Sequence, residues 1–297
     1  MNPAPIFQKP GSALILLGHG STVNPDSSAP TLYHAGEIKR RGCFGEVVCA
    51  FWKEEPGFRQ VLDMVESTDI YIVPNFISEG YFTQKIIPRE LGLHGPVTTL
   101  PARPGRPARI LKYCEPAGNH RRMTEFLLDR AREAAPGVDP GRAALVIVGH
   151  GTSLNENSGL AVNKQAARIR ARHQYAEVLG MFIEQTPFVT GWQQHTTAPN
   201  VIVVPFFISD GMHSYQDIPV LLGIQAARGA AAGGAEIFRR DPYSIGGRRL
   251  YYSSAIGADR LFTDVILDQV LRFDTRRPRL SCAPDAASSL SPGCARR

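Results

Sequence analysis

Short runs of apolar, often β-branched residues alternate with longer amphipathic stretches along the chain. In the second half, residues 144–150, 177–183 and 200–208 are continuous apolar runs, typical of strands buried on both faces of a parallel sheet. Four longer stretches have the mixed pattern of helices, at 157–173, 187–198, 215–225 and 258–271. This alternation predicts a doubly wound α/β domain, with ligands bound where the strands end.

The pattern occurs twice because the sequence repeats itself. ALILLGHGSTVN returns as ALVIVGHGTSLN, and PNFISEGYFTQKIIP returns as PFFISDGMHSYQDIP, both 131 residues later. Residues 11–88 align with residues 142–219 without a gap and share 22 of 78 positions. Unrelated sequences would share about 5 from average residue usage. We therefore predict an α/β fold of two tandem doubly wound domains with parallel sheets, produced by internal duplication.

The repeats divide the chain into four parts. Residues 1–134 form the first repeat, residues 135–141 a linker, and residues 142–274 the second repeat. The tail, residues 275–297, is rich in Pro, Ser and Arg and poor in large apolar residues, so we predict that it is disordered.

Composition narrows the class of protein. The formal net charge is +6, but the basic residues are scattered, which favours a small polycarboxylate over nucleic acid or a membrane surface as the partner. Five cysteines without a CxxC pair argue against a disulfide scaffold and a structural zinc site. The sequence lacks an apolar span of about 20 residues and a signal-peptide pattern, so we expect a cytoplasmic protein.

Candidate chemistry appears where the two repeats differ. The second repeat has ligand-type side chains after three strands: His150, Glu184 and His213. The first repeat has His19, Lys53 and Phe82 at the same positions. Two imidazoles and a carboxylate can form an open facial site for cobalt, iron, nickel or zinc, whereas a lysine repels a cation. The second repeat is therefore the candidate metal site.

Plainer interpretations of these residues stay open. A histidine between two glycines also fits a tight turn, and Glu184 also fits a solvated carboxylate at a strand end. We expect the remaining histidines at the surface: His34, His94, His120, His173 and His195.

The order of GHG, a strand ending in F-x-E, and PxFxxxGxHxxxDIP resembles the sirohydrochlorin chelatase (CbiX/SirB) family of class II chelatases. The resemblance implies insertion of cobalt or ferrous iron into sirohydrochlorin without ATP, and the sequence has no GxxxxGK[ST] loop. It also implies that His150 and His213 bind the metal and accept pyrrole protons, assisted by Glu184. The divalent metal is then a substrate, and no organic cofactor is expected.

The substrate would carry carboxylates, and basic residues near the site would hold them. Lys164, Arg168 and Arg172 are spaced four apart on one face of a predicted helix, which is a candidate grip and equally a plain solvated face.

Other functions fit parts of the same pattern. The main alternative is a tetrapyrrole or metal carrier that performs no insertion. A metallohydrolase would use the same trio, although the sequence has no HExxH helix, and a histidine phosphatase would need an arginine where Gly149 precedes His150. Because two repeats in one chain can pair with each other, we expect a monomer.

Overall fold

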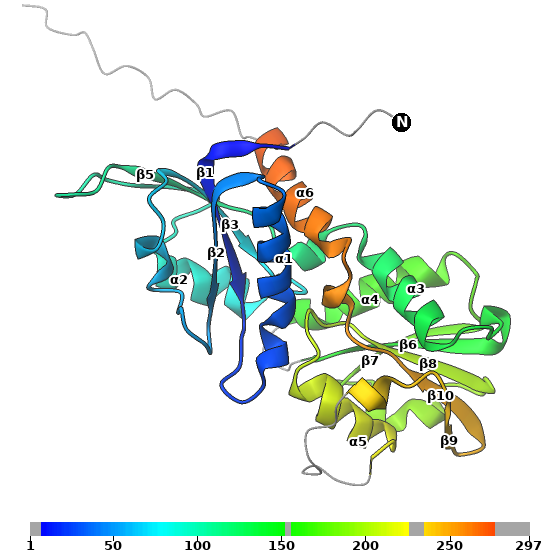
Figure 1. The fold of residues 1–297 in the computed structure, drawn as a ribbon. Coiled ribbons are helices and arrows are strands. Elements are labelled where there is room, and N and C mark those ends of the chain that lie inside the picture. Colours follow the sequence, from blue (N-terminus) through cyan, green and yellow to red (C-terminus); the bar gives the residue numbers. More distant parts are fainter. Residues whose placement is uncertain (1–6, 152–155, 226–234, 277–297) are drawn as a thin grey trace, which may run out of the picture.

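The chain folds into two five-stranded sheets, one in each sequence repeat (Figure 1). This computed structural model describes residues 7–151, 156–225 and 235–276. Sheet one consists of β1 (Lys9–Gly18), β2 (Phe44–Phe51), β3 (Asp69–Pro74), β4 (Val97–Leu100) and β5 (Arg109–Tyr113). Sheet two consists of β6 (Ala143–Gly149), β7 (Glu177–Phe182), β8 (Asn200–Pro205), β9 (Tyr243–Ile245) and β10 (Arg248–Tyr252).

The two sheets have the same topology. Their strand orders are β2-β1-β3-β5-β4 and β7-β6-β8-β10-β9. The predicted parallel pairing is confirmed for four strands of each sheet, but β4 and β9 run antiparallel to their neighbours. The predicted fold class is confirmed, and the antiparallel edge adds one detail: each edge strand is joined to its neighbour by a hairpin instead of a crossover helix.

Both faces of each sheet are buried, which explains the continuous apolar runs in the sequence. Side chains alternate along a strand, so Leu14 and Leu16 of β1 face a central core while Ile15 faces an outer one. The central core is shared, since it contains Leu145 and Ile147 of β6 as well. The two repeats thus have one common interior and two separate outer cores.

Helices cover the four sheet faces. The α-helices within the described residues are α1 (Ala29–Arg40), α2 (Ile87–Leu91), α3 (Met123–Ala134), α4 (Glu156–Arg170), α5 (Ile218–Leu222) and α6 (Phe262–Thr275). The short α2 and α5 pack on the outer cores, and the four long helices pack on the central core. Among the helices of the described ranges, none has both the length and the apolar character that a membrane span requires.

The last helix of each repeat packs against the other repeat. α6 lies beside α1 and β3 of sheet one, and α3 lies against β8 and α4 of sheet two (Figure 1). Polar contacts stabilise this exchange of helices between the repeats. They include an ion pair between Arg41 and Asp264 at 2.6 Å and a hydrogen bond from Thr124 Oγ1 to Gln165 Oε1 at 2.6 Å. The division of the chain into consecutive repeats does not foresee this exchange.

Several predicted helices differ from the structure. The helix expected at 187–198 is a short 3₁₀ turn, Val189–Gln194, since Val, Thr and Gly at its start are weak helix formers. The helix expected at 215–225 is a π-helix, His213–Asp217, followed by α5, which ends at Gly223 with φ of +82°. The helices expected at 157–173 and 258–271 are present as α4 and α6.

Two of the five histidines expected at the surface are buried. His34 has no exposed surface. Its Nδ1 and Nε2 atoms are hydrogen-bonded to Thr263 Oγ1 and to the carbonyl of Gly257, both from the second repeat. His120 is 2% exposed and lies 2.6 Å from Asp268. A buried polar ring with partners from the other repeat cannot be recognised from local sequence. His94, His173 and His195 are exposed, as predicted.

The predicted disordered tail lies, from residue 277 on, outside the described residues. The same holds for residues 152–155 after the second GHG and for residues 226–234, which lie in a Gly/Ala-rich stretch of the second repeat.

Candidate functional site

Three neighbouring strands of sheet two end at the same edge. In the register, Gly149 of β6 lies beside Phe182 of β7, and Val148 lies beside Pro205 of β8. His150 directly follows β6, and the backbone N–H of Glu184 donates to the carbonyl of His150 at 2.9 Å. The fold therefore brings the chain segments of the predicted trio to one place, because the carboxyl ends of parallel strands meet.

The two histidines of the trio contact each other. The ring centroids of His150 and His213 are 4.8 Å apart, with an interplanar angle of 82°. Nδ1 of His150 lies 2.8 Å from the carbonyl oxygen of Gly151, which can only accept, so this nitrogen carries the proton. The Nε2 atom of neutral His150 then keeps its lone pair for a metal ion or a proton.

The carboxylate of Glu184 lies close to this pair. Its Oε2 is 3.6 Å from Nδ1 of His150, which is too far for a hydrogen bond. The Glu184 side chain is 59% exposed and that of His150 is 38% exposed. The site is thus open to solvent on the side of the carboxylate, where a cation can approach.

Asp217 orients His213. The π-helix His213–Asp217 places the Asp217 Oδ2 atom 2.7 Å from Nδ1 of His213. Burial lowers the pKa of His213, and the hydrogen bond to Asp217 opposes this effect only in part. A neutral imidazole whose Nδ1–H is held by a carboxylate presents Nε2, which is the arrangement of many metal-binding histidines. Asp217 was not among the predicted residues, although its i,i+4 spacing from His213 is visible in the motif.

Within the described residues, no group of three His, Cys, Asp or Glu side chains is arranged to hold a metal ion. The structure brings His150, Glu184 and His213 together, but their role as metal ligands stays a prediction.

The same edge of sheet one keeps the backbone geometry and lacks the donors. His19 Nδ1 lies 2.9 Å from the carbonyl oxygen of Gly20, as in the second repeat. The ring facing it belongs to Phe82, with centroids 5.1 Å apart at 75°. Lys53 stands in place of Glu184, and the buried Ile86 stands in place of Asp217. This edge has one imidazole and no carboxylate at these positions.

The predicted grip is only partly compatible with the structure. Lys164 and Arg168 are exposed on α4, whose first turn lies nearest to the site. Arg172 lies beyond the other end of this helix and forms an ion pair with Glu125 of α3. The ion pair ties Arg172 to the exchanged helix at the far end of α4, and its place in the grip, like that of Lys164 and Arg168, stays a prediction.

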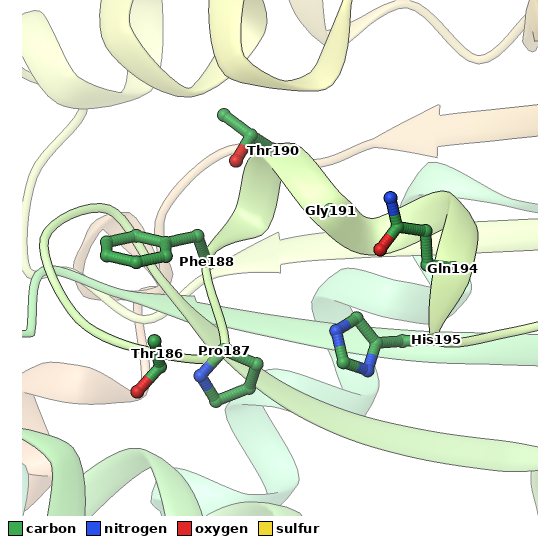
Figure 2. Close-up of a pocket in the computed structure, with 7 residues that line it drawn as sticks. All are labelled: Thr186, Pro187, Phe188, Thr190, Gly191, Gln194 and His195. Atoms are coloured by element: carbon green, nitrogen blue, oxygen red, sulfur yellow. The ribbon is translucent and has the colours of Figure 1, made fainter.

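The described residues form two notable hollows at the surface. Figure 2 shows the larger, of about 510 Å³, which is lined by Thr186, Pro187, Phe188, Thr190, Gly191, Gln194 and His195. Neither His150 nor His213 lines it, and His195 is its one ionisable side chain. This hollow is not part of the candidate site.

The second hollow, of about 390 Å³, lies between the repeats and is lined by Asp26, Ala29, Pro30, Tyr33, Asp210, Tyr215, Ala258 and Arg260. The hydroxyl of Tyr215 donates to Oδ2 of Asp26 at 3.0 Å, and burial raises the pKa of Asp210 to about 6. Since Tyr215 is two residues from His213, the candidate site borders the boundary with the first repeat.

Comparisons with known proteins agree with this architecture. A family model described as CbiX matches residues 13–134 and again residues 144–272. A probable sirohydrochlorin cobaltochelatase of Halobacterium salinarum is 38% identical over 271 residues, covering 86% of this chain and 90% of that protein. A sirohydrochlorin cobaltochelatase of Methanococcus maripaludis is 32% identical over 139 residues, covering 42% of this chain and 96% of that protein.

Solved structures share the fold. SirB from Bacillus subtilis with Fe³⁺ has a TM-score of 0.63 at 17% identity, covering 88% of this chain and 95% of that one. A multi-domain protein of Deinococcus radiodurans with structural similarity to chelatases has a TM-score of 0.68 at 28% identity. The comparison covers 87% of this chain and about half, 54%, of the Deinococcus chain. With both repeats matched by one family model, the chain belongs to the CbiX family.

Proposed function

We propose that the protein inserts a divalent metal ion, Co²⁺ or Fe²⁺, into sirohydrochlorin or a related tetrapyrrole, for cobalamin or siroheme biosynthesis. Membership of the CbiX family and the names of its relatives support this reaction. The metal ion is a substrate here, and neither ATP nor an organic cofactor takes part.

One observation carries the proposal: the imidazole pair of His150 and His213 at the edge of sheet two. Their rings are 4.8 Å apart, and both Nδ1 atoms lie within hydrogen-bond distance of an acceptor. Each Nε2 is then the nitrogen that remains for coordination. The first repeat has the same fold and a phenylalanine instead of the second histidine, so the pair is not a requirement of folding.

The chemistry of insertion suits such a pair. Exchanging two pyrrole N–H protons for one M²⁺ requires groups that are neutral near pH 7 and can accept protons. In the proposed reaction, His150 and His213 hold the ion through Nε2 and take up the protons when the ion moves to the macrocycle. Burial lowers the pKa of His213 and so keeps it neutral. Glu184 attracts the cation and assists proton removal.

The macrocycle would be held through its carboxylates. We assign this contact mainly to Lys164. This residue is eight residues into α4 and therefore about 12 Å along the helix from its start. Arg168 is one turn further, at about 18 Å, and reaches only the outer substituents.

A monomer is the proposed working form. The two repeats already share a central core and exchange helices, so each covers the apolar face that a partner subunit would otherwise cover.

The decisive experiment follows the absorbance spectrum of sirohydrochlorin with Co²⁺ and then Fe²⁺, with and without the purified protein, at matched metal concentration and pH. Insertion faster than the spontaneous rate is the expected result, and the faster of the two ions identifies the preferred metal. Tight binding of the pigment without acceleration would instead make the protein a carrier, and the absence of any interaction would refute both.

A further inference from the structure

The π-helix that carries His213 has one carbonyl that its own pattern of hydrogen bonds cannot satisfy. In this helix, His213–Asp217, the N–H of Ile218 donates to the carbonyl of His213, five residues earlier. In the same pattern, the next carbonyl, that of Ser214, would need the N–H of residue 219. Residue 219 is a proline, which has no N–H to donate. The carbonyl of Ser214 therefore needs a donor from outside the helix.

Tyr252 provides this donor. Its hydroxyl donates to the carbonyl oxygen of Ser214 at 2.8 Å. Tyr252 is the last residue of β10, which pairs with β8, the strand that precedes the π-helix. Its ring packs in the outer core of sheet two, with its centroid 5.4 Å from that of Phe238. The neighbouring strand end thus supports the helix through a side chain.

This hydrogen bond is closed to water. Tyr252 and Ser214 have no exposed surface. Burial raises the pKa of Tyr252 well above its ordinary value of 10, so the hydroxyl stays protonated near pH 7 and can donate. Removing the hydroxyl would leave a buried carbonyl without a partner. The cost of that carbonyl favours a change in the hydrogen-bond pattern of the helix.

The π-helix sets the contact between His213 and Asp217, its first and last residues. The Oδ2 atom of Asp217 lies 2.7 Å from Nδ1 of His213. Ser214, whose carbonyl Tyr252 holds, directly follows His213. Another helical pattern has a different number of residues per turn, so it would rotate His213 relative to Asp217 and redirect its Nε2 atom.

The first repeat has the same support without the ligand. The hydroxyl of Tyr113 donates to the carbonyl oxygen of Thr83 at 2.6 Å, and Pro88 again stands five residues after that carbonyl. The π-helix held in this way begins with Phe82 in place of His213. The support is therefore a property of the duplicated fold, and only in the second repeat does it act on a donor side chain.

We propose that Tyr252 is a positioning residue for metal binding: its hydroxyl holds the π-helix in the form that presents Nε2 of His213 to the ion. The metal role of His213 rests on the proposed function. Because Tyr252 has no exposed surface, it acts through the backbone of the helix and not by contact with a ligand.

The test removes one hydroxyl from each repeat. Tyr252→Phe and Tyr113→Phe each delete a hydrogen bond of the same kind and keep the ring, and circular dichroism verifies that both variants are folded. Isothermal titration calorimetry measures the binding of Co²⁺ alone to the full chain, without pigment. Tyr252→Phe should weaken this binding about tenfold, the lower end of the usual cost of losing a group that orients a metal ligand. Tyr113→Phe should weaken it no more than about twofold, because its helix has no metal donor at the position of His213.

A second measurement needs no metal. Nitrogen NMR shifts of the imidazole show which ring nitrogen carries the proton, and the His213 signal is identified by its loss in His213→Gln. We expect Nδ1–H in the wild type and in Tyr113→Phe, since the Asp217 carboxylate accepts from this group. Tyr252→Phe should shift the population of His213 toward Nε2–H.

Equal Co²⁺ affinity in the two variants, with the proton of His213 in its wild-type position, would overturn the proposal. A loss of the same size in both variants would overturn it as well, since it would show a general weakening of the protein. The result is separate from the insertion reaction: a Co²⁺ site that depends on Tyr252 supports the proposal even if the chain inserts no metal. Conversely, insertion at the wild-type rate by Tyr252→Phe, with wild-type Co²⁺ affinity, would remove the role of Tyr252 and leave the proposed function standing.

Discussion

The carboxyl edges of the two sheets are the same piece of backbone with different chemistry. Both have GHG after their first strand, a histidine whose Nδ1 faces the next glycine carbonyl, and a five-residue π-helix after the third parallel strand. π-helices are rare and frequently mark functional sites. Here the π-helix is also present in the first repeat, which lacks the counterparts of Glu184 and His213. The fold therefore provides the geometry, and only a few side chains provide the candidate chemistry.

Those side chains change as a set. His213 and its partner Asp217 are replaced by Phe82 and Ile86, so the imidazole and the carboxylate that orients it are absent together. A buried carboxylate without its histidine would be costly, and an apolar pair at the same place packs instead on the outer core. The difference between the edges is therefore a consistent exchange of polar for apolar contacts.

The largest expected effect is on metal insertion, and it compares the corresponding edges of the two sheets directly. His213→Ala should lower kcat/KM for metal insertion about a thousandfold, because it removes a metal donor and a proton acceptor together. His19→Ala should lower it no more than about threefold, since His19 faces a phenylalanine. The spectrophotometric insertion assay measures both. Equal losses in the two variants would refute the asymmetric site.

A second prediction concerns what the repeats share. A Cβ atom added to Gly118 would lie 1.9 Å from the carbonyl oxygen of Ile77, and one added to Gly257 would lie 2.0 Å from that of Ile208. Gly118→Ala and Gly257→Ala should each destabilise the protein by about 3 kcal/mol, because backbone must move to relieve the clash.

Urea unfolding measures both losses. Gly36→Ala on α1 is the control, because nothing lies within 4 Å of its added Cβ, and it should be neutral or slightly stabilising. A large loss in only one of the two variants would show that the repeats do not depend on the same close approach.

How much of this could be predicted from sequence depended on how local the signal was. The duplication, the strands, the histidine that both repeats share at His150 and the differences at Glu184 and His213 follow from short motifs and apolar runs. The exchange of α3 and α6 could not be predicted, because both helices have an apolar face that fits either repeat. The burial of His34 and His120 depends on that exchange, and so was missed with it.

The candidate site shows the same limit. Asp217 stands in the motif that identifies the second repeat, but its contact with Nδ1 of His213 depends on a π-helix that periodicity does not predict. Arg172 fitted the helical spacing of a grip, and the structure ties it to Glu125, 47 residues earlier in the chain. Spacing along one helix predicts which side chains share a face, not what that face meets.

Asp217 gives the third prediction. Asp217→Ala should lower insertion activity about 10- to 100-fold, the usual cost of removing a carboxylate that orients a metal-binding histidine. Since the carboxylate raises the pKa of His213, its loss should also move the acidic limb of the pH–rate profile to lower pH. Asp217→Asn, which keeps a hydrogen-bond acceptor, should recover part of the rate. A reduced rate with an unmoved pH profile would point to a merely structural role.

The smallest effect concerns His34, whose counterpart in the second repeat is Gln165. The two side chains make equivalent contacts, to Thr263 and Thr124 of the exchanged helices. Burial lowers the pKa of His34 below its ordinary value of 6.5. The unfolded chain therefore binds this proton more readily than the folded one, and stability should fall as the pH drops below about 6.5.

His34→Gln should keep both hydrogen bonds, because an amide can accept from Thr263 and donate to the carbonyl of Gly257. It cannot take up the proton, so the variant should lose less stability than the wild type between pH 7 and pH 5. Urea unfolding at several pH values measures the difference. The pKa of His120 is also lowered by burial, but His120 is present in both proteins, so its contribution to the pH dependence of stability cancels in the comparison. Identical pH dependence would mean that the pKa of His34 is the same in the folded and unfolded chains, and would contradict the prediction.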